Sequence, residues 1–146
     1  MTDILQFTLD KFTFTIPTDR RYSPDGLWVQ EHDGRLLVGV SDYFQQHNGD
    51  AAFVELSPPG TTVSRGGRFG AVETIKVDQE LAAPLSGVIA EVNERLEQEA
   101  ELINLDPYGA GWLVTLEPDN WLVEKDDLLP PEIYLDLACE QAQREL

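Results

Sequence analysis

The chain has 146 residues, of which 42% are hydrophobic, and its 27 acidic and 10 basic side chains give a formal net charge of -17. That length and apolar fraction suffice for one folded domain with a core of its own. Nucleic acids and anionic membrane surfaces are disfavoured as partners, because binding to either requires clustered Lys and Arg. The acidity is compatible with transient docking to basic surfaces of other proteins.

The cysteine and the N-terminus narrow the options further. The single Cys139 excludes an internal disulfide framework and a multi-cysteine metal site, and it fits reducing surroundings. No basic stretch precedes an apolar run at the N-terminus, so we expect no secretory signal. No segment reaches the roughly 18 apolar residues that a membrane span needs. We therefore expect a cytoplasmic protein.

Short strands separated by turn residues dominate the pattern along the chain. At the N-terminus, apolar residues alternate in two phases that change at Asp10-Lys11, which predicts a strand, a turn and a second strand. The pattern of short apolar runs between turns continues to about residue 116. Strands are expected at residues 5–9, 12–16, 27–29, 35–40, 50–56, 61–63, 69–75, 79–83, 88–92 and 112–116. So many short strands indicate an all-β sandwich or barrel.

Helices are expected in few places. A short oxygen-bearing side chain at 41–42 can cap a brief helix through His47, because it accepts the free N–H groups of the first turn. Residues 94–101 are expected to form a polar helical turn or a loop. Near the C-terminus, apolar residues recur at three- and four-residue spacing. This spacing predicts a short helix at 128–129 and, after a proline break, an amphipathic helix from Pro131.

Lys76 occupies a special place in this pattern, and it is a rare residue type, since the other lysines are Lys11 and Lys125. If strands 69–75 and 79–83 pair, residues 76–78 form the tip of their hairpin. The amine of Lys76 is then held out in solvent by a rigid scaffold. A modifying ligase can reach such an amine, and a long group attached there can reach several proteins. The position is typical of a swinging arm.

The residues around this lysine resemble those of lipoyl and biotinyl carrier domains, in the spacings Gly-x-x-Val-x-x-Gly, Val-Glu-x-x-Lys and Ala-Pro-x-x-Gly-x-Val. Biotinyl domains normally have Met on both sides of the lysine, whereas Ile75 and Val77 stand here, so lipoyl is favoured. More narrowly, residues 22–137 resemble the glycine cleavage system H protein family. The matching stretches are YSPDGLWV (22–29), VGVSD (38–42), GDAAFVEL (49–56), GAVETIK (70–76), PLSG (84–87), LIN (102–104) and DPYGAGW (106–112).

The resemblance implies a mainly β fold, the lipoyl/biotinyl-type barrel-sandwich hybrid of two antiparallel sheets with a short internal helix and C-terminal helices. It also implies a single lipoyl-carrier domain over residues 1–146. Within that domain we expect a core at about 20–117, an N-terminal strand extension at 1–17 and a C-terminal helical segment at about 119–145.

For function, the resemblance implies a carrier component and not an enzyme, with no catalytic residue. Lys76 would be joined by an amide to lipoic acid, and the arm would shuttle a lipoamide-bound intermediate, the aminomethyl group in glycine cleavage. The implied partners are a lipoate ligase or lipoyltransferase, a pyridoxal-phosphate glycine decarboxylase, a folate-dependent aminomethyltransferase and dihydrolipoamide dehydrogenase. Neither nucleic acid nor a membrane is among them.

Four further positions are candidates for the cleft of the arm or for recognition by the ligase. By resemblance, His47 matches a histidine that lines the cleft of the loaded arm, and Glu73 matches a position that the ligase would read. Asp78 belongs to a pair that departs from the family, in which alanine follows the lysine. Leu27 stands where the family has a Glu that faces the amine of the loaded arm. Leucine cannot pair with an ammonium group.

Three interpretations remain open. The first is a carrier for glycine cleavage, and the second is an H-like lipoate-binding protein for another pathway, such as heterodisulfide-reductase-like sulfur oxidation with its sulfur-metabolism enzymes. The third is a non-lipoylated acidic adaptor. An independent active site is disfavoured, because nothing in the pattern joins Ser41, His47 and Asp50 into a triad. Neither a phosphate-binding glycine loop nor a metal-ligand set is present in the sequence.

Overall fold

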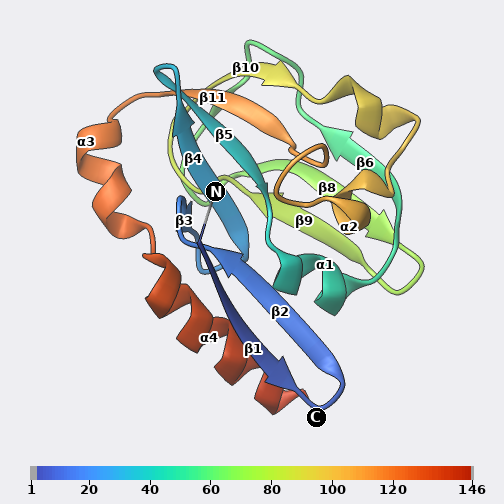
Figure 1. Ribbon diagram of the computed structural model, residues 1–146. Helices are drawn as coiled ribbons and strands as arrows, with labels where there is room; N and C mark the ends of the chain where they lie inside the picture. Colours follow the sequence, from blue (N-terminus) through green and yellow to red (C-terminus); the bar gives the residue numbers. More distant parts are fainter. Residues whose placement is uncertain (1–2, 146) are drawn as a thin grey trace.

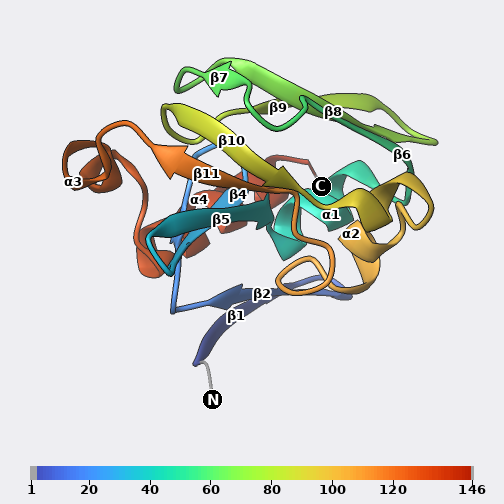
Figure 2. The same cartoon turned by 90° about the horizontal axis from the view of Figure 1, so that it is seen from above.

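The computed structural model describes residues 3–145. A six-stranded sheet and a three-stranded sheet pack over each other, and a separate two-stranded hairpin lies beyond the larger sheet (Figures 1 and 2). Every pair of neighbouring strands is antiparallel. The expected mainly β barrel-sandwich hybrid is thus confirmed, and the hairpin adds a small third sheet to the expected two.

The large sheet has the strand order β3-β4-β5-β11-β10-β7, with bounds β3 Arg21–Tyr22, β4 Leu27–His32, β5 Arg35–Val40, β11 Val114–Pro118, β10 Gly87–Val92 and β7 Thr62–Val63. The small sheet has the order β6-β8-β9, with bounds β6 Ala51–Leu56, β8 Arg68–Thr74 and β9 Asp78–Ala82. The hairpin joins β1 Ile4–Leu9 to β2 Phe12–Pro17. The helices are α1 Asp42–Asn48, η1 Glu94–Glu97, α2 Leu102–Leu105, α3 Trp121–Glu124, η2 Lys125–Asp127 and α4 Pro131–Arg144.

The main core lies between the two sheets. Successive side chains of a strand point to opposite faces, so each strand contributes every second residue to the core. On β8, Val72 is buried and its neighbour Glu73 is exposed. The same cluster takes in residues from both sheets and from the connecting loops, including Val38, Val40, Leu81, Leu85, Ile89, Leu113 and Leu116.

A second apolar cluster fixes α4 and the hairpin against the other face of the large sheet. At its centre the rings of Tyr22 and Tyr134, both fully buried, stack with centroids 4.6 Å apart. The hydroxyl of Tyr22 donates a hydrogen bond to the carbonyl oxygen of Pro17, 2.7 Å away. The remaining buried members come from β2, β4, α1 and α4: Phe14, Ile16, Trp28, Tyr43, Ala138 and Ala142. Both ends of the described chain are therefore packed against the central strands.

Hydrogen bonds also tie the hairpin to α1. The backbone N–H and the hydroxyl of Thr15 both donate to Oδ2 of Asp42, at 2.9 and 3.1 Å. The hydroxyl of Tyr108 donates to the carbonyl oxygen of Thr15 at 2.6 Å and accepts from the backbone N–H of Asp42 at 2.8 Å. Burial raises the pKa of Tyr108, which keeps this hydroxyl protonated. The hairpin is consequently fixed with respect to α1.

The C-terminal prediction is partly wrong. The helix from Pro131 is confirmed, but the short helix expected at 128–129 lies earlier, as α3 and η2. Leu128 is extended and buried in the main core, and Leu129 forms an antiparallel bridge with Tyr22. The apolar residues at these two positions thus serve core packing and strand pairing, and they do not form the buried face of a helix. No helix among residues 3–145 is long and apolar enough to cross a membrane.

The hydroxyl of Tyr134 gives a test of how α4 supports α1. It lies 2.7 Å from Oγ of Ser41, and that same Oγ accepts the N-cap hydrogen bond from the N–H of Phe44. We expect Tyr134→Phe to lower the free energy of unfolding by about 1–2 kcal/mol, because a buried hydroxyl loses its partner. Urea unfolding of Tyr134→Phe, Ser41→Ala and the double variant checks this. Costs that simply add would contradict a direct coupling between the two side chains.

Candidate carrier site around Lys76

Lys76 lies in the turn that joins β8 to β9, at one end of the small sheet. The turn consists of Ile75, Lys76 and Val77, so it begins and ends one residue earlier than expected. Ile75 is 93% exposed, and the side chain of Lys76 is exposed as well. The expectation of a lysine at a hairpin tip therefore agrees with the geometry.

Thr74, which the sequence did not single out, holds this turn in shape. Its Oγ1 accepts the backbone N–H groups of Lys76 and Val77, at 3.2 and 3.0 Å, and donates to the carbonyl oxygen of Val77 at 3.0 Å. The backbone N–H of Thr74 donates to that same carbonyl oxygen at 2.8 Å. The backbone on both sides of the amine-bearing side chain is thus fixed by one buried hydroxyl.

Glu73 and Asp78 face each other across the neck of the hairpin, as directly paired residues of β8 and β9. Both are exposed. Like charges in directly opposed positions disfavour strand pairing, so the pair is tolerated here because solvent surrounds it. Two exposed carboxylates consequently flank the lysine at the base of its turn.

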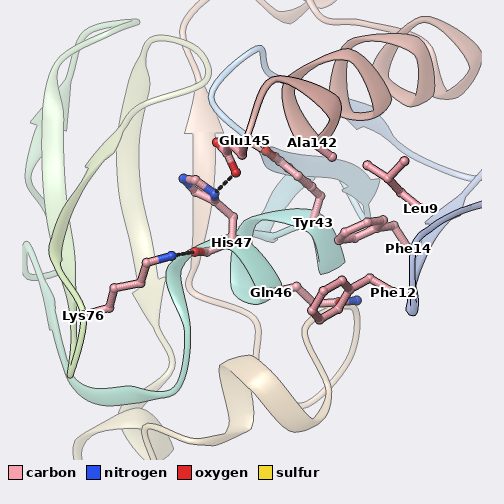
Figure 3. Close-up of a pocket in the computed structure, with 9 residues that line it drawn as sticks. All are labelled: Leu9, Phe12, Phe14, Tyr43, Gln46, His47, Lys76, Ala142 and Glu145. Atoms are coloured by element: carbon pink, nitrogen blue, oxygen red, sulfur yellow. Dashed lines mark hydrogen bonds and ion pairs between the residues drawn. The ribbon is translucent and has the colours of Figure 1, made fainter.

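The amine of Lys76 contacts α1 and not these acids. Its Nζ donates to the carbonyl oxygen of His47 at 3.1 Å (Figure 3). Nδ1 of His47 in turn lies 2.8 Å from Oε2 of Glu145, and the ring of Tyr43 stacks on the imidazole with centroids 5.7 Å apart. Burial, and secondarily the carboxylate of Glu145, raise the pKa of Tyr43 to about 12.

Two pockets open on either side of this His47–Glu145 pair. One, which we call the hairpin pocket, has a volume of about 170 Å³ and is lined by Lys76, by α1 and by the apolar residues Leu9, Phe12 and Phe14 of the β1-β2 hairpin. The other, which we call the polar pocket, has a volume of about 360 Å³, and its lining includes Asp25, Gln79, Gln141 and Arg144. Tyr43, His47 and Glu145 line both pockets. Lys76 lines only the hairpin pocket of these two.

Of the sequence candidates, Leu27 lies away from both pockets. Leu27 is 1% exposed and packs in the main core, so it lines neither pocket, and its expected place in the cleft is corrected. Its neighbour Gly26 does line the polar pocket. The side chain of Leu27, the first residue of β4, packs into the main core, whereas Gly26 precedes the strand and has no side chain.

Ser41, His47 and Asp50 do not form a catalytic triad. Ser41 is fully buried, where its hydroxyl contacts Tyr134 and caps α1, and His47 pairs with Glu145. A nucleophile must reach substrate, and this hydroxyl does not. Among residues 3–145, no group of three His, Cys, Asp or Glu side chains is placed to hold a metal ion.

Lipoic acid, the group that the sequence resemblance implies, fits the surroundings of Lys76. Amide formation requires an amine that another protein can reach, and Lys76 is exposed on a fixed turn. The attached group is an alkyl chain that ends in an apolar disulfide ring, and an aromatic-walled pocket opens beside the same lysine. The amine needed for the amide bond and an apolar surface for the ring are therefore both present.

Comparisons with known proteins agree with this geometry. The profile of the family described as "Glycine cleavage H-protein" matches residues 20–140. A "Probable glycine cleavage system H protein" from Haloarcula marismortui is 43% identical over 124 residues, which cover 85% of this chain and 97% of the relative. A "Glycine cleavage system H protein" from Carboxydothermus hydrogenoformans is 38% identical over 128 residues, 88% of this chain and 98% of the relative.

A solved structure is similar as well. The crystal structure of a glycine cleavage system H protein from Mycobacterium marinum superposes with a TM-score of 0.69 at 40% sequence identity. The match covers 71% of this chain and 87% of that protein. Fold and sequence thus point to the same relatives.

The role of Thr74 is tested by comparison with Thr115. We expect Thr74→Val to lower the free energy of unfolding by about 1 kcal/mol or more, because the turn loses three side-chain hydrogen bonds. Oγ1 of Thr115 is buried without a hydrogen-bond partner, so Thr115→Val should be neutral or stabilising. Chemical denaturation of both variants gives the comparison. Equal effects of the two substitutions would show that Thr74 does not hold the turn.

Proposed function

The chain belongs to the glycine cleavage H-protein family, and from that premise we propose that it is a lipoyl carrier whose lipoic acid is attached to Lys76. It acts as a single carrier domain over residues 1–146 and has no turnover of its own. One observation carries the proposal: an exposed lysine stands on a turn that the buried hydroxyl of Thr74 fixes from within.

The fixed turn suits a carrier for a physical reason. A tethered group reaches its partner sites at an effective concentration set by the tether, so each transfer behaves as an intramolecular step. A rigid base keeps the sweep of the arm centred on one point of the surface. The lipoyl group, when attached, supplies a disulfide that alternates with a dithiol, and the chain's own residues position its point of attachment.

Recognition by the lipoate ligase or lipoyltransferase depends, in this proposal, on Glu73 and Asp78. Their carboxylates are exposed and paired across the neck of the hairpin that presents Lys76. A modifying enzyme with basic residues at the rim of its channel would read both charges while it takes in the amine. The amine itself donates to the carbonyl oxygen of His47.

The acidic surface as a whole suits successive, short-lived partners. A net charge of -17 favours rapid encounter with basic surfaces without a permanent complex. For the glycine cleavage pathway the partners are the pyridoxal-phosphate decarboxylase, the folate-dependent aminomethyltransferase and dihydrolipoamide dehydrogenase. We place this exchange in the cytoplasm, whose reducing conditions keep the lone Cys139 as a thiol.

A second client pathway is favoured by one observation at Leu27. The family has a Glu at this position, facing the amine of the loaded arm, whereas here the leucine side chain is buried in the core. No carboxylate from this position can therefore pair with an amine on the arm. The alternative is an H-like lipoate-binding protein that serves sulfur-metabolism enzymes instead of glycine cleavage.

Lys76→Arg tests lipoyl attachment most simply, because it keeps the positive charge and removes the amine that can be acylated. After expression with a lipoate ligase, we expect the parent chain to gain the mass of one lipoyl group and Lys76→Arg to gain none. Lys125→Arg is the matched control, and it should be modified like the parent. An unmodified parent chain would support the non-lipoylated adaptor instead.

The client pathway is tested with glycine itself. We expect the lipoylated protein, incubated with glycine and the pyridoxal-phosphate decarboxylase, to gain the mass of an aminomethyl group if it serves glycine cleavage. The decarboxylase with a lipoylated H protein from Carboxydothermus hydrogenoformans is the positive control. Loading of the control alone would reject the glycine pathway and favour the second client.

A further inference from the structure

The apolar wall of the hairpin pocket comes from the N-terminal part of the chain, which lies outside the matched family region. The family profile begins at residue 20, whereas β1 and β2 lie at residues 4–17. Even so, the hairpin contributes Leu9, Phe12 and Phe14 to the same pocket that Lys76 lines. In Figure 3, Lys76 lies on one side of His47 and these apolar residues lie on the other. Family membership does not explain what this wall is for.

We propose that the hairpin pocket holds the disulfide ring of the lipoyl arm carried by Lys76, between visits to partner enzymes. The inference rests on the proposed function, since it requires a lipoylated Lys76. It goes beyond that function because it assigns the ring to a pocket whose apolar wall comes from the β1-β2 hairpin, outside the matched family region, in preference to the polar pocket.

The size of the pocket suits such a ring. Its volume is about 170 Å³. An apolar protein cavity of about 150 Å³ is known to take up benzene, and a five-membered ring with two sulfur atoms is of comparable bulk. Because the pocket reaches from the side chain of Lys76 to the hairpin, the alkyl chain of the arm can follow the pocket to the ring's place at the far end.

The chemistry of the wall also suits sulfur. Within the lining of the pocket, the ring of Phe14 lies next to those of Phe12 and Tyr43, with centroids 6.4 and 5.4 Å away. Sulfur makes favourable contacts with aromatic rings at about 5 Å. Phe12 is 47% exposed in the absence of the arm, so an apolar group that covers it removes apolar surface from water. The polar pocket has none of these hairpin residues, and its lining adds Asp25, Gln79 and Arg144.

The pocket is formed before the arm arrives. The carbonyl oxygen of Thr13 accepts a hydrogen bond from Nε2 of Gln46 at 3.0 Å, next to the bonds between Thr15 and Asp42 that fix β2 to α1. Little ordering is left for the protein to undergo when the ring binds. A tether gives an effective concentration on the order of millimolar, so a contact of millimolar affinity already holds the ring for much of the time.

The test measures how fast a water-soluble phosphine reduces the lipoyl disulfide, followed by the ultraviolet absorbance of that disulfide. The chain's single cysteine makes no internal disulfide, so it adds no signal. We expect Phe12→Ala to be reduced about three- to tenfold faster than the parent, because the ring no longer docks. Ile4→Ala is the matched control: Ile4 is a similarly exposed residue of the hairpin that does not line the pocket. It should be reduced at the parent rate.

A second measurement separates docking from any loss of stability in the variant itself. Ligand contacts that form only in the folded state raise the melting temperature. We therefore expect the lipoylated parent to melt above its unmodified form, and the two forms of Phe12→Ala to melt together. Intact mass confirms lipoylation of each sample first, so failure of the proposed function appears as an unmodified chain.

Two results would overturn the inference in lipoylated samples. One is equal reduction rates for the parent and Phe12→Ala, with equal melting temperatures for the modified and unmodified parent. The other is faster reduction in Arg144→Ala but not in Phe12→Ala, which would place the ring in the polar pocket.

Discussion

The alternation of side chains along β8 and β9 determines which residues around Lys76 face solvent and which face the core. Val72 and Leu81 enter the core between the two sheets, so Glu73 and Asp78 must face solvent. Thr74 is the last inward residue of β8, and its hydroxyl is therefore free to bind the turn from inside. A shift of one residue in the pairing would send acids into the core and the anchoring residues outward. Exposure of Lys76 is thus a consequence of what lies buried next to it.

Around this hairpin, the site is assembled from distant parts of the chain. The carbonyl group that receives the amine belongs to α1, and the carboxylate of Glu145 beside His47 comes from the C-terminus. The apolar wall comes from the N-terminal hairpin. The contact between Ser41 and Tyr134 and the bonds between Thr15 and Asp42 hold these parts together. The N-terminal hairpin and the segment at Glu145 therefore form part of the surroundings of Lys76.

Local patterns were enough to predict some of this arrangement. The strands of the N-terminal hairpin and the turn at Lys76 follow from alternation and turn residues, which act over a few positions. Tertiary packing decided the rest. Leu128 has helical spacing but is buried in an extended segment, and Leu27 occupies a family position whose side chain here turns inward. The role of Thr74 depends on hydroxyl geometry, which residue type alone does not reveal.

Site-resolved mass spectrometry of the protein isolated from its own cells tests the central claim most directly. Peptides that contain Lys11, Lys76 and Lys125 can be compared within one sample, because these are the three lysines of the sequence. We predict a lipoyl group on Lys76 and none on the other two. An unmodified Lys76 in cells that lipoylate their other carrier proteins would contradict the account.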